Sequence, residues 1–556
     1  METTDRATEG DPLKRGEDGA ETGTAPSATE LKKKSCKEVL GFAKLTHWRT
    51  AVFFLSLFLC LTIVFAFSFI IPCPVRPQYQ VSWNRTFSDA ATYDFLAIEA
   101  ASDDKVLDVL FVVKMREGSQ NNTCADAGLP SPCVFVFAVD GTDGETLWER
   151  PLHPEFHWAQ CGLEKDKQKT GRTWDCLLSH SDQFTAVDKH SGEIKWQQPQ
   201  PAGLRSTVPV LSVPDLDGDK VDDVALVASD NTQTQLVFLS GKTGAQIGAT
   251  VTLDSTKTPQ HLLHCTKDGS HYVLLQKDTG LYGLALWRIA AMAKAGMGAS
   301  LKKDKLWERN ASASTGLVPI YESDSLKKVF KIQGTEESDD DPSNLLLVSG
   351  RKVSVVDGKN LQLLWSFNTS SVLSEPSFGH FDKDELLDVV VEEDIGNYTK
   401  RIVILDGKSG GVLWQVKLLA SLNAPGPASI HTTNSFSIFV FWGMMPTETN
   451  SSVSLTSDRR SYMLHPLYSQ VLLESSNVID HIITFKATLL ERGRHAAYFL
   501  LTGPGIEGDE GTVLLSKRKL KQDVPDSKVL RIGSGGSTET NEDIKEAFNR
   551  LRFRDW

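Results

Sequence analysis

The chain has 556 residues, of which 40% are hydrophobic, and carries a formal net charge of −12. This length allows one large domain or two ordinary ones. The acidic balance argues against a nucleic-acid partner, which would favour a basic surface.

The first 50 residues are predicted to form a disordered cytoplasmic tail. Residues 1–34 are rich in Thr, Glu, Asp, Gly and Pro and contain almost no large apolar side chain. Such a segment cannot bury enough surface to offset the entropy lost on ordering. A basic stretch then leads to the next element, with Lys32, Lys33, Lys34, Lys37, Lys44 and Arg49.

An uncharged apolar run, Ala51–Ile71, follows this tail. It matches the roughly 20 residues that a helix needs to cross the hydrocarbon core of a membrane. It is too long, and begins too far along the chain, for a cleaved signal peptide. Because the basic residues precede it, the positive-inside rule leaves the N-terminus in the cytoplasm. The sequence predicts a type II single-pass membrane protein with a signal-anchor helix, at the plasma membrane. The alternative, a buried core helix, would need neighbouring helices to cover it.

Six Asn-x-Ser/Thr sequences predict a glycoprotein, and all of them follow the apolar run. The predicted acceptors are Asn84, Asn121, Asn310, Asn368, Asn397 and Asn450. Their position agrees with the type II orientation, although most of the chain lies on that side.

Six of the eight cysteines also follow the apolar run, where an oxidising compartment would favour disulfide bonds. The short spacings of Cys124 to Cys133 and of Cys161 to Cys176 suit loops that are stapled at their base. Cys73 is left to pair with Cys265 or with a second chain. Six cysteines allow 15 connectivities, so the alternatives stay open. The spacing of cysteine and histidine does not indicate zinc.

A repeated hairpin organises residues 72–518, which we expect to form the ectodomain. In its clearest copy, Ile402–Trp414, an apolar run enters the turn Asp406–Gly410 and a second run ends at Trp414. Gly permits positive φ in such a turn, and Asp can accept hydrogen bonds from the backbone of the turn. The turn recurs about every 50 residues, with one gap of roughly twice that. The five copies begin at Asp140, Asp188, Ser240, Asp357 and Asp406.

Paired strands at a period of about 40–50 residues are typical of a β-propeller, whose blades are small four-stranded sheets. One hairpin cannot shield its own apolar face, so neighbouring blades must pack on it. The sequence predicts an all-β fold with a seven- or eight-bladed propeller after a single transmembrane helix. The Trp that follows four of the turns is expected to pack between blades, at Trp148, Trp196, Trp365 and Trp414.

Two interruptions are expected to be insertions that explain the wide gap between the third and fourth copies. Arg288–Gly298 is Ala-rich and predicted to be helical, whereas Gly334–Asn344 is acidic and predicted to be a solvated loop. Residues 519–556 are predicted to be a linker and a C-terminal helix over Asn541–Phe553, begun by Thr540 or Asn541. Its apolar stripe favours packing on the propeller rim, with partner binding as the alternative.

The candidate metal site is the loop sequence DLDGDKVDD, from Asp215 to Asp223. Positions one, three, five and nine carry side-chain oxygens, and position seven can offer a backbone carbonyl. Ca²⁺ takes six to eight oxygen ligands, so the pattern predicts a calcium site, with a solvated turn as the alternative. The predicted ligands are Asp215, Asp217, Asp219, Val221 and Asp223.

Two further segments repeat this pattern less completely. His380–Val389 keeps Asp382, Asp384 and Asp388 but begins with a histidine, which is a poor calcium ligand. Ser102–Val109 is weaker, and we interpret it as the same turn without its ligands.

These motifs carry a resemblance to known families. Pro214–Val224 resembles the FG-GAP repeat of integrin alpha chains, whose Asp loop binds calcium, and the hairpins resemble the repeats of quinoprotein dehydrogenases. The whole layout is similar to the integrin-alpha FG-GAP repeat-containing family, also named family with sequence similarity 234. The resemblance implies a type II membrane protein with a propeller. Only one Asp loop is intact here, so it does not imply a face with several calcium ions.

No catalytic residue is assigned, and we do not expect an enzyme. Gly407–Gly411 fits G-x-S-x-G, but a nucleophile elbow needs a strand–turn–helix context and both flanks here are strands. We expect a non-catalytic protein whose propeller loops bind a protein or glycan partner at the cell surface. One alternative is a lumenal trafficking or chaperone-like membrane factor. Another is a quinone-dependent oxidoreductase, although fold similarity does not transfer function.

Overall fold

The computed structural model describes most of the chain after residue 46. The described ranges are 47–70, 82–102, 106–118, 123–163, 172–201, 204–229, 233–253, 260–332, 343–419, 424–446, 459–477, 481–490, 495–506, 510–533 and 539–554. The predicted tail up to residue 46, the predicted acceptors Asn121 and Asn450, Cys73 and most of the predicted acidic loop lie outside them. The chain divides into two units, Met1–Gln78 and Tyr79–Trp556.

The described part of the first unit is one helix, α1 (His47–Ile70). Its window Trp48–Phe65 is long and apolar enough to cross a membrane, and none of this window is buried. Leu, Phe, Val and Ile side chains make up most of this window, as a lipid-facing helix requires. The predicted apolar helix is confirmed, with its start at His47 instead of Ala51.

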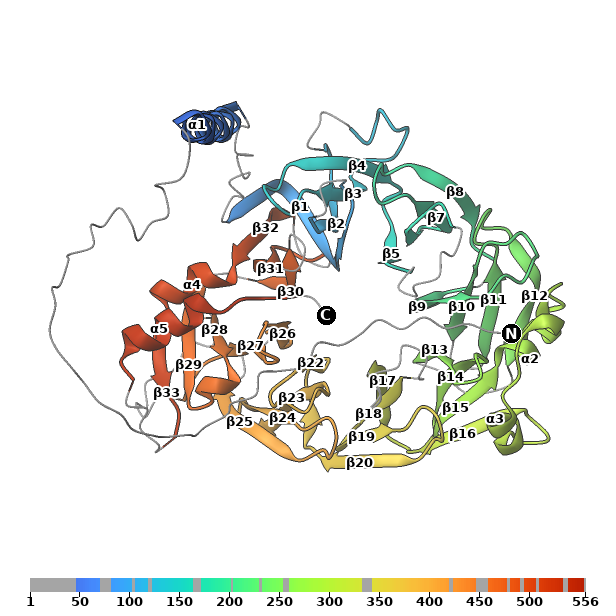
Figure 1. Cartoon of the computed structure of the whole chain (residues 1–556). Coiled ribbons are helices and arrows are strands. Elements are labelled where there is room, and N and C mark those ends of the chain that lie inside the picture. The colour runs from blue at the N-terminus through green and yellow to red at the C-terminus, as the bar shows by residue number, and fades with distance from the viewer. Residues whose placement is uncertain are drawn as a thin grey trace, which may run out of the picture. The chain divides into compact units, whose positions relative to one another are not determined.

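The second unit consists of antiparallel sheets arranged around a ring (Figure 1). Strands that follow one another in the sequence are neighbours in each sheet. The first sheets of the ring contain β1 (Trp83–Glu99), β2 (Asp108–Met115), β3 (Cys133–Val139), β4 (Thr146–Leu152), β5 (Phe156–Gln160), β6 (Cys176–His180), β7 (Gln183–Val187), β8 (Ile194–Pro199), β9 (Ser206–Val213), β10 (Asp223–Ser229), β11 (Thr234–Leu239) and β12 (Gln246–Leu253).

The middle of the chain continues the same arrangement. Its sheets contain β13 (His261–Cys265), β14 (His271–Lys277), β15 (Gly280–Ala285), β16 (Leu317–Glu322), β17 (Leu326–Ile332), β18 (Asn344–Ser349), β19 (Lys352–Val356), β20 (Leu363–Asn368), β21 (Ser371–Val372), β22 (Ser377–Gly379), β23 (Asp388–Gly396), β24 (Thr399–Leu405) and β25 (Val412–Leu419).

The last sheets complete the ring. They contain β26 (Ala428–His431), β27 (Ser437–Gly443), β28 (Arg459–Leu464), β29 (Val471–Asn477), β30 (Ile482–Leu490), β31 (His495–Thr502), β32 (Gly511–Lys519) and β33 (Lys528–Arg531). The helices of this unit are α2 (Leu286–Ala293), η2 (Gly298–Ser300), α3 (Lys305–Asn310), η3 (Pro466–Tyr468), α4 (Leu520–Asp526) and α5 (Asn541–Arg550).

Strand β1 joins the two ends of this unit. Its residues Trp83–Ala90 pair with β32, whereas Ala91–Glu99 pair with β2. The order β30-β31-β32-β1-β2-β3-β4 is therefore one seven-stranded sheet. The choice between seven and eight blades, which the sequence leaves open, depends on whether this sheet is counted as one blade or as two that share β1.

The core lies between neighbouring sheets. Central strands such as β3 are buried at every position, because sheets pack on both of their faces. One apolar cluster joins Val353 and Trp365 of β19–β20 to Val389 and Val403 of β23–β24 in the next sheet. Each sheet therefore needs its neighbours to cover it, which confirms the physical reason given for the repeat.

The five predicted hairpins are confirmed. Each Asp or Ser turn joins two neighbouring strands at one end of a sheet's strand order, as Asp406 does between β24 and β25. The wide gap, however, holds a complete sheet, β13–β16, so the prediction that insertions alone fill it is wrong. In that sheet the third and fourth strands are joined by α2, η2 and α3 in place of the Asp-Gly turn. The predicted helix ends at Ala293, because Lys294 adopts a left-handed conformation with φ 58.

Residues after β32 add to the last sheets. β33 pairs with β29, and α5 begins with the predicted cap, in which Thr540 and Asp543 each accept from the other's backbone N–H. Ile544 and Phe548 of α5 are buried together with Leu520 of α4. The predicted linker thus contains a helix and a strand of its own.

Candidate calcium site and the loop face

In each sheet, the connection between the first and second strands and the connection between the third and fourth strands lie at the same ends of the strands. This follows from the alternating direction of antiparallel strands. Contacts between neighbouring sheets show that these connections lie on the same side of the ring. His264 at the end of β13, for example, lies with its Nε2 3.0 Å from the carbonyl oxygen of Gly358 in the β19–β20 turn. We call this side of the ring the loop face.

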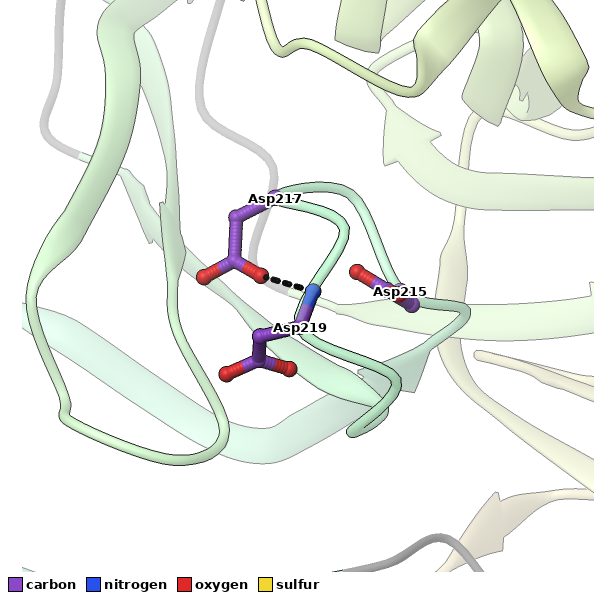
Figure 2. A group of neighbouring side chains, drawn as sticks. All are labelled: Asp215, Asp217 and Asp219. Atoms are coloured by element: carbon purple, nitrogen blue, oxygen red, sulfur yellow. Dashed lines mark hydrogen bonds between the residues drawn. The ribbon is translucent and has the colours of Figure 1, made fainter.

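The predicted calcium loop joins β9 to β10 on the loop face and brings three carboxylates together (Figure 2). Carboxylate oxygens of Asp215, Asp217 and Asp219 all lie within 4.8 Å of one another, and we call these residues the Asp215 triad. Asp217 is exposed and the other two are half-buried. The geometry therefore places three of the five predicted ligand residues around one point.

Backbone N–H groups fix the shape of this loop. Asp215 accepts from Gly218 at 2.6 Å and from Lys220 at 2.8 Å. Asp217 accepts from Asp219 at 3.1 Å, as the dashed line in Figure 2 shows. Gly218 has φ +89, a conformation that favours glycine. Three carboxylates held this close repel one another, and a hard cation with oxygen ligands would offset that repulsion.

Asp223, the predicted ninth-position ligand, is fully buried beside the triad. Its Oδ2 accepts from the N–H of Leu216 at 2.6 Å, and its Oδ1 accepts from the N–H of Gly241 at 2.9 Å. Burial raises the pKa of Asp223 to about 6, and the charges of Asp217 and Asp215 also raise it. Both of its oxygens are thus engaged in tying the loop to the next hairpin turn.

The two weaker repeats of the motif contain the same tie. Asp108 accepts from the N–H groups of Ala101 and Gly141, at 2.8 and 3.1 Å. Asp388 accepts from those of Phe381 and Gly407, at 2.6 and 3.0 Å. An Asp at the start of the following strand recurs in all three sequences, and this was the available signal for a structural role that sequence reasoning missed.

A second group of carboxylates lies on the same face. Asp382 and Asp384, from the β22–β23 connection, meet Asp406 of the β24–β25 turn, with oxygens within 4.8 Å of one another. We call these three residues the Asp406 triad. Sequence reasoning did not bring Asp406 to this loop, because it lies in a different motif. His380 is buried, with its Nδ1 2.7 Å from the carbonyl oxygen of Leu386.

The predicted packing role of the repeated Trp is confirmed. The ring N–H of Trp148 donates to the carbonyl oxygen of Lys189 at 2.7 Å, and that of Trp414 donates to Ser469 at 2.8 Å. Each bond joins one sheet to the turn or loop of the next. Trp196 covers Gly244 of the following sheet, since a Cβ on that glycine would lie 2.3 Å from the Trp ring.

Both predicted disulfides are present. Cys124 pairs with Cys133, and Cys161 pairs with Cys176. The predicted acceptors within the described residues, Asn84, Asn310, Asn368 and Asn397, are all exposed. The alternative pairing of Cys73 with Cys265 involves a residue outside the described ranges.

Residues 83–554 match the family described as FAM234A/B beta-propeller. The chain belongs to this FAM234A/B family. Protein FAM234A of Bos taurus is 37% identical over 517 residues, which cover 92% of this chain and 92% of that protein. Protein FAM234B of Mus musculus is 26% identical over 538 residues, covering 92% of this chain and 83% of that one.

Membership of the FAM234A/B family confirms the predicted propeller. The match to a solved structure, BamB from Moraxella catarrhalis, covers 78% of this chain and 100% of the BamB chain, at 12% identity and a TM-score of 0.41. The FG-GAP resemblance and the calcium site of this FAM234A/B chain stay predictions.

Proposed function

We propose that this chain is a non-catalytic type II membrane protein whose propeller binds a protein or glycan partner at the cell surface through its loop face. The observation that carries the proposal is the presence of two separate carboxylate triads on that one face. Loops on a rigid scaffold are the usual place for binding residues. The ring of mutually covering sheets provides such a scaffold.

The proposed orientation is supported by chemistry on the C-terminal side of α1. Disulfides form and persist in oxidising compartments, and two pairs lie there, Cys124–Cys133 and Cys161–Cys176. The basic residues that precede α1 favour the cytoplasm for the N-terminus. The four described glycosylation acceptors are exposed and would be accessible to the lumenal machinery.

The non-catalytic character is supported by what Ser409 does in its turn. Its hydroxyl donates to the carboxylate of Asp406 at 2.5 Å and accepts from the N–H of Gly411 at 3.2 Å. It lies between two strands, β24 and β25, and not before a helix. These contacts give Ser409 a structural role in the turn, and its two flanking strands differ from the strand–turn–helix context of a nucleophile elbow.

Ca²⁺ is the cation that we propose for the Asp215 triad. Its carboxylate oxygens converge on one point, and Ca²⁺ prefers oxygen ligands. Binding there would stiffen the loop face where the partner is proposed to bind. The Asp406 triad also brings three carboxylates together, but its loop sequence lacks the complete Asp pattern of the Asp215 loop.

Proximity labelling on living cells tests the partner proposal. The full chain carries a labelling peroxidase at its C-terminus, and extracellular proteins that become labelled are compared between variants. Asp217→Ala with Asp219→Ala should remove the specific partners. The control pair, Asp278→Ala with Asp324→Ala, removes two exposed carboxylates from the opposite side, at the β14–β15 and β16–β17 connections.

Two results would contradict the proposal. Labelling confined to cytosolic proteins would reverse the proposed orientation. Labelling of the same extracellular proteins by both double variants and by the unmodified chain would remove the Asp215 triad from the binding surface. A membrane-impermeant biotin reagent distinguishes the cell surface from the lumen, where the trafficking alternative would place the chain.

A further inference from the structure

A cavity of about 500 Å³ lies between the last sheets and the C-terminal segment of the chain. This volume lies within the range of small-molecule sites in proteins. Four segments of the chain line it: Thr433 in the β26–β27 connection, the start of β31, the β32–α4 junction and the residues after α5. The cavity contains none of the residues of the two Asp triads.

The lining is strongly basic. Lys519, Lys521 and Arg552 contribute cationic groups, His495 adds an imidazole, and the lining residues that the structure describes include no Asp or Glu. Among the described residues, none of these three cations forms an ion pair with a carboxylate. This basic site belongs to a chain with a net charge of −12. A locally reversed charge of this kind attracts anions and selects against cations.

Lys521 and Arg552 line the cavity close enough to influence each other's charge. Burial lowers the pKa of Lys521, and the neighbouring charge of Arg552 lowers it further. An anion between them would relieve this repulsion and accept hydrogen bonds from the guanidinium and ammonium groups. The cavity is thus electrostatically complementary to a phosphate, sulfate or carboxylate group.

An apolar wall faces the cations. Leu551 and Phe553 line the cavity, and the Nζ of Lys521 lies 5.7 Å from the centre of the Phe553 ring. A bare inorganic ion would leave this wall without a partner. A ligand with a ring or a short apolar body next to its anionic group would cover it.

The segment that carries Arg552 and Phe553 is held in place from two sides. The N–H of Thr433 donates to the carbonyl oxygen of Arg552 at 2.9 Å, and Thr432 bridges to Phe553. The helix before this segment, α5, is anchored by its buried Ile544 and Phe548. The backbone that carries Arg552 and Phe553 is therefore fixed before a ligand arrives, which lowers the entropy cost of binding.

We propose that this cavity binds a small molecule with a phosphate, sulfate or carboxylate group on a ring-containing body. The anionic group contacts Lys519, Lys521 and Arg552, and the ring lies against Phe553. This site is independent of the proposed partner and of calcium.

Four probes test the proposal on the full chain in phosphatidylcholine nanodiscs. Glucose 6-phosphate and N-acetylneuraminate combine an anion with a ring, inorganic phosphate is the anion alone, and glucose is the ring alone. Melting temperature and calorimetric titration are the readouts. We expect saturable binding of at least one anionic sugar, at least ~10-fold weaker binding of phosphate, and none of glucose. The two sugars distinguish a phosphate from a carboxylate source.

Variants locate the binding. Lys519→Gln with Lys521→Gln should weaken the binding of the anionic sugar by ~10-fold or more, and Arg552→Gln should do the same on its own. Lys242→Gln with Lys408→Gln is the matched control, because it removes two exposed lysines from hairpin turns. If Lys519→Gln with Lys521→Gln lowers the melting temperature in the absence of ligand, the affinity of Arg552→Gln alone is used to test the proposal. Absence of saturable binding by both anionic sugars, or unchanged affinity in Arg552→Gln, would overturn the proposal.

Discussion

The ring N–H of Trp365 donates a hydrogen bond to the carbonyl oxygen of Gly407, 2.8 Å away in the next sheet. The same ring covers Gly410, on which a Cβ would lie 2.5 Å from the Cε3 atom of Trp365. One side chain thus links two sheets by a directed bond and by a close approach that only glycine permits. Trp148 repeats both contacts, with Lys189 and Gly192.

Gly410→Ala is expected to destabilise the propeller more than Gly396→Ala. Both glycines have positive φ, +71 and +87, so both substitutions carry a backbone penalty of about 1 kcal/mol. Only the first also places a methyl group against Trp365, because nothing lies within 4 Å of a Cβ at Gly396. The clash adds about 1–3 kcal/mol. Urea unfolding of the full chain in detergent measures the difference, and equal effects would show that the Trp contact is unimportant.

Trp365→Phe is expected to cost more stability than Trp196→Phe. The first leaves the carbonyl oxygen of Gly407 without its donor, a loss of about 1–3 kcal/mol. The second removes a similar ring, but among the described residues Nε1 of Trp196 has no hydrogen-bond partner. The difference between the two variants therefore measures the contribution of the hydrogen bond apart from that of ring packing. Matching shifts in melting temperature would assign the whole effect to packing.

Asp388→Asn is expected to change how stability depends on pH. Burial raises the pKa of Asp388 to about 7 in the folded chain, against about 3.9 when unfolded. Between these values the folded state binds more protons, so this group makes the free energy of unfolding fall as pH rises, by at most about 1.4 kcal/mol per pH unit. The variant lacks this contribution.

The measurement is the difference in melting temperature between unmodified chain and variant, followed from pH 4.5 to 7 with a chelator present. We expect the melting temperature of the unmodified chain to fall relative to that of Asp388→Asn as pH rises. Asp278→Asn, which removes an exposed carboxylate on the opposite side, serves as the control. Parallel curves for Asp388→Asn would mean that its proton affinity is the same in both states.

Calcium is expected to raise the melting temperature of the full chain, because a ligand that binds only the folded state stabilises it. At a calcium concentration of 100 Kd, the free energy of unfolding should increase by about 2.7 kcal/mol. Asp217→Ala with Asp219→Ala should abolish the rise, because it removes two carboxylates of the Asp215 triad. Asp278→Ala with Asp324→Ala removes two exposed carboxylates from the opposite side, and this control pair should leave the rise in place. A normal response in the first variant would exclude the Asp215 triad as the calcium site.

Local sequence determined much of this protein. The Asp-Gly turns were predictable because Asp accepts from its own turn and Gly supplies positive φ, as Asp406 and Gly410 do. The apolar length of α1, the cap at Thr540 and the short disulfide spacings are likewise properties of neighbouring residues. Interactions within a few residues do not depend on where the rest of the chain lies.

Tertiary structure alone decided how these pieces combine. Pairing of β1 with β32 joins residues more than 400 positions apart, and no local pattern identifies such a partner. Asp215 and Asp223 have the same side chain in the same motif, yet one lies in the triad and the other is buried between Leu216 and Gly241. The difference comes from the sheets packed around each carboxylate. The basic cavity depends on tertiary packing too, since its walls, from Thr433 to Phe553, become neighbours only when the last sheets and the C-terminal segment pack together.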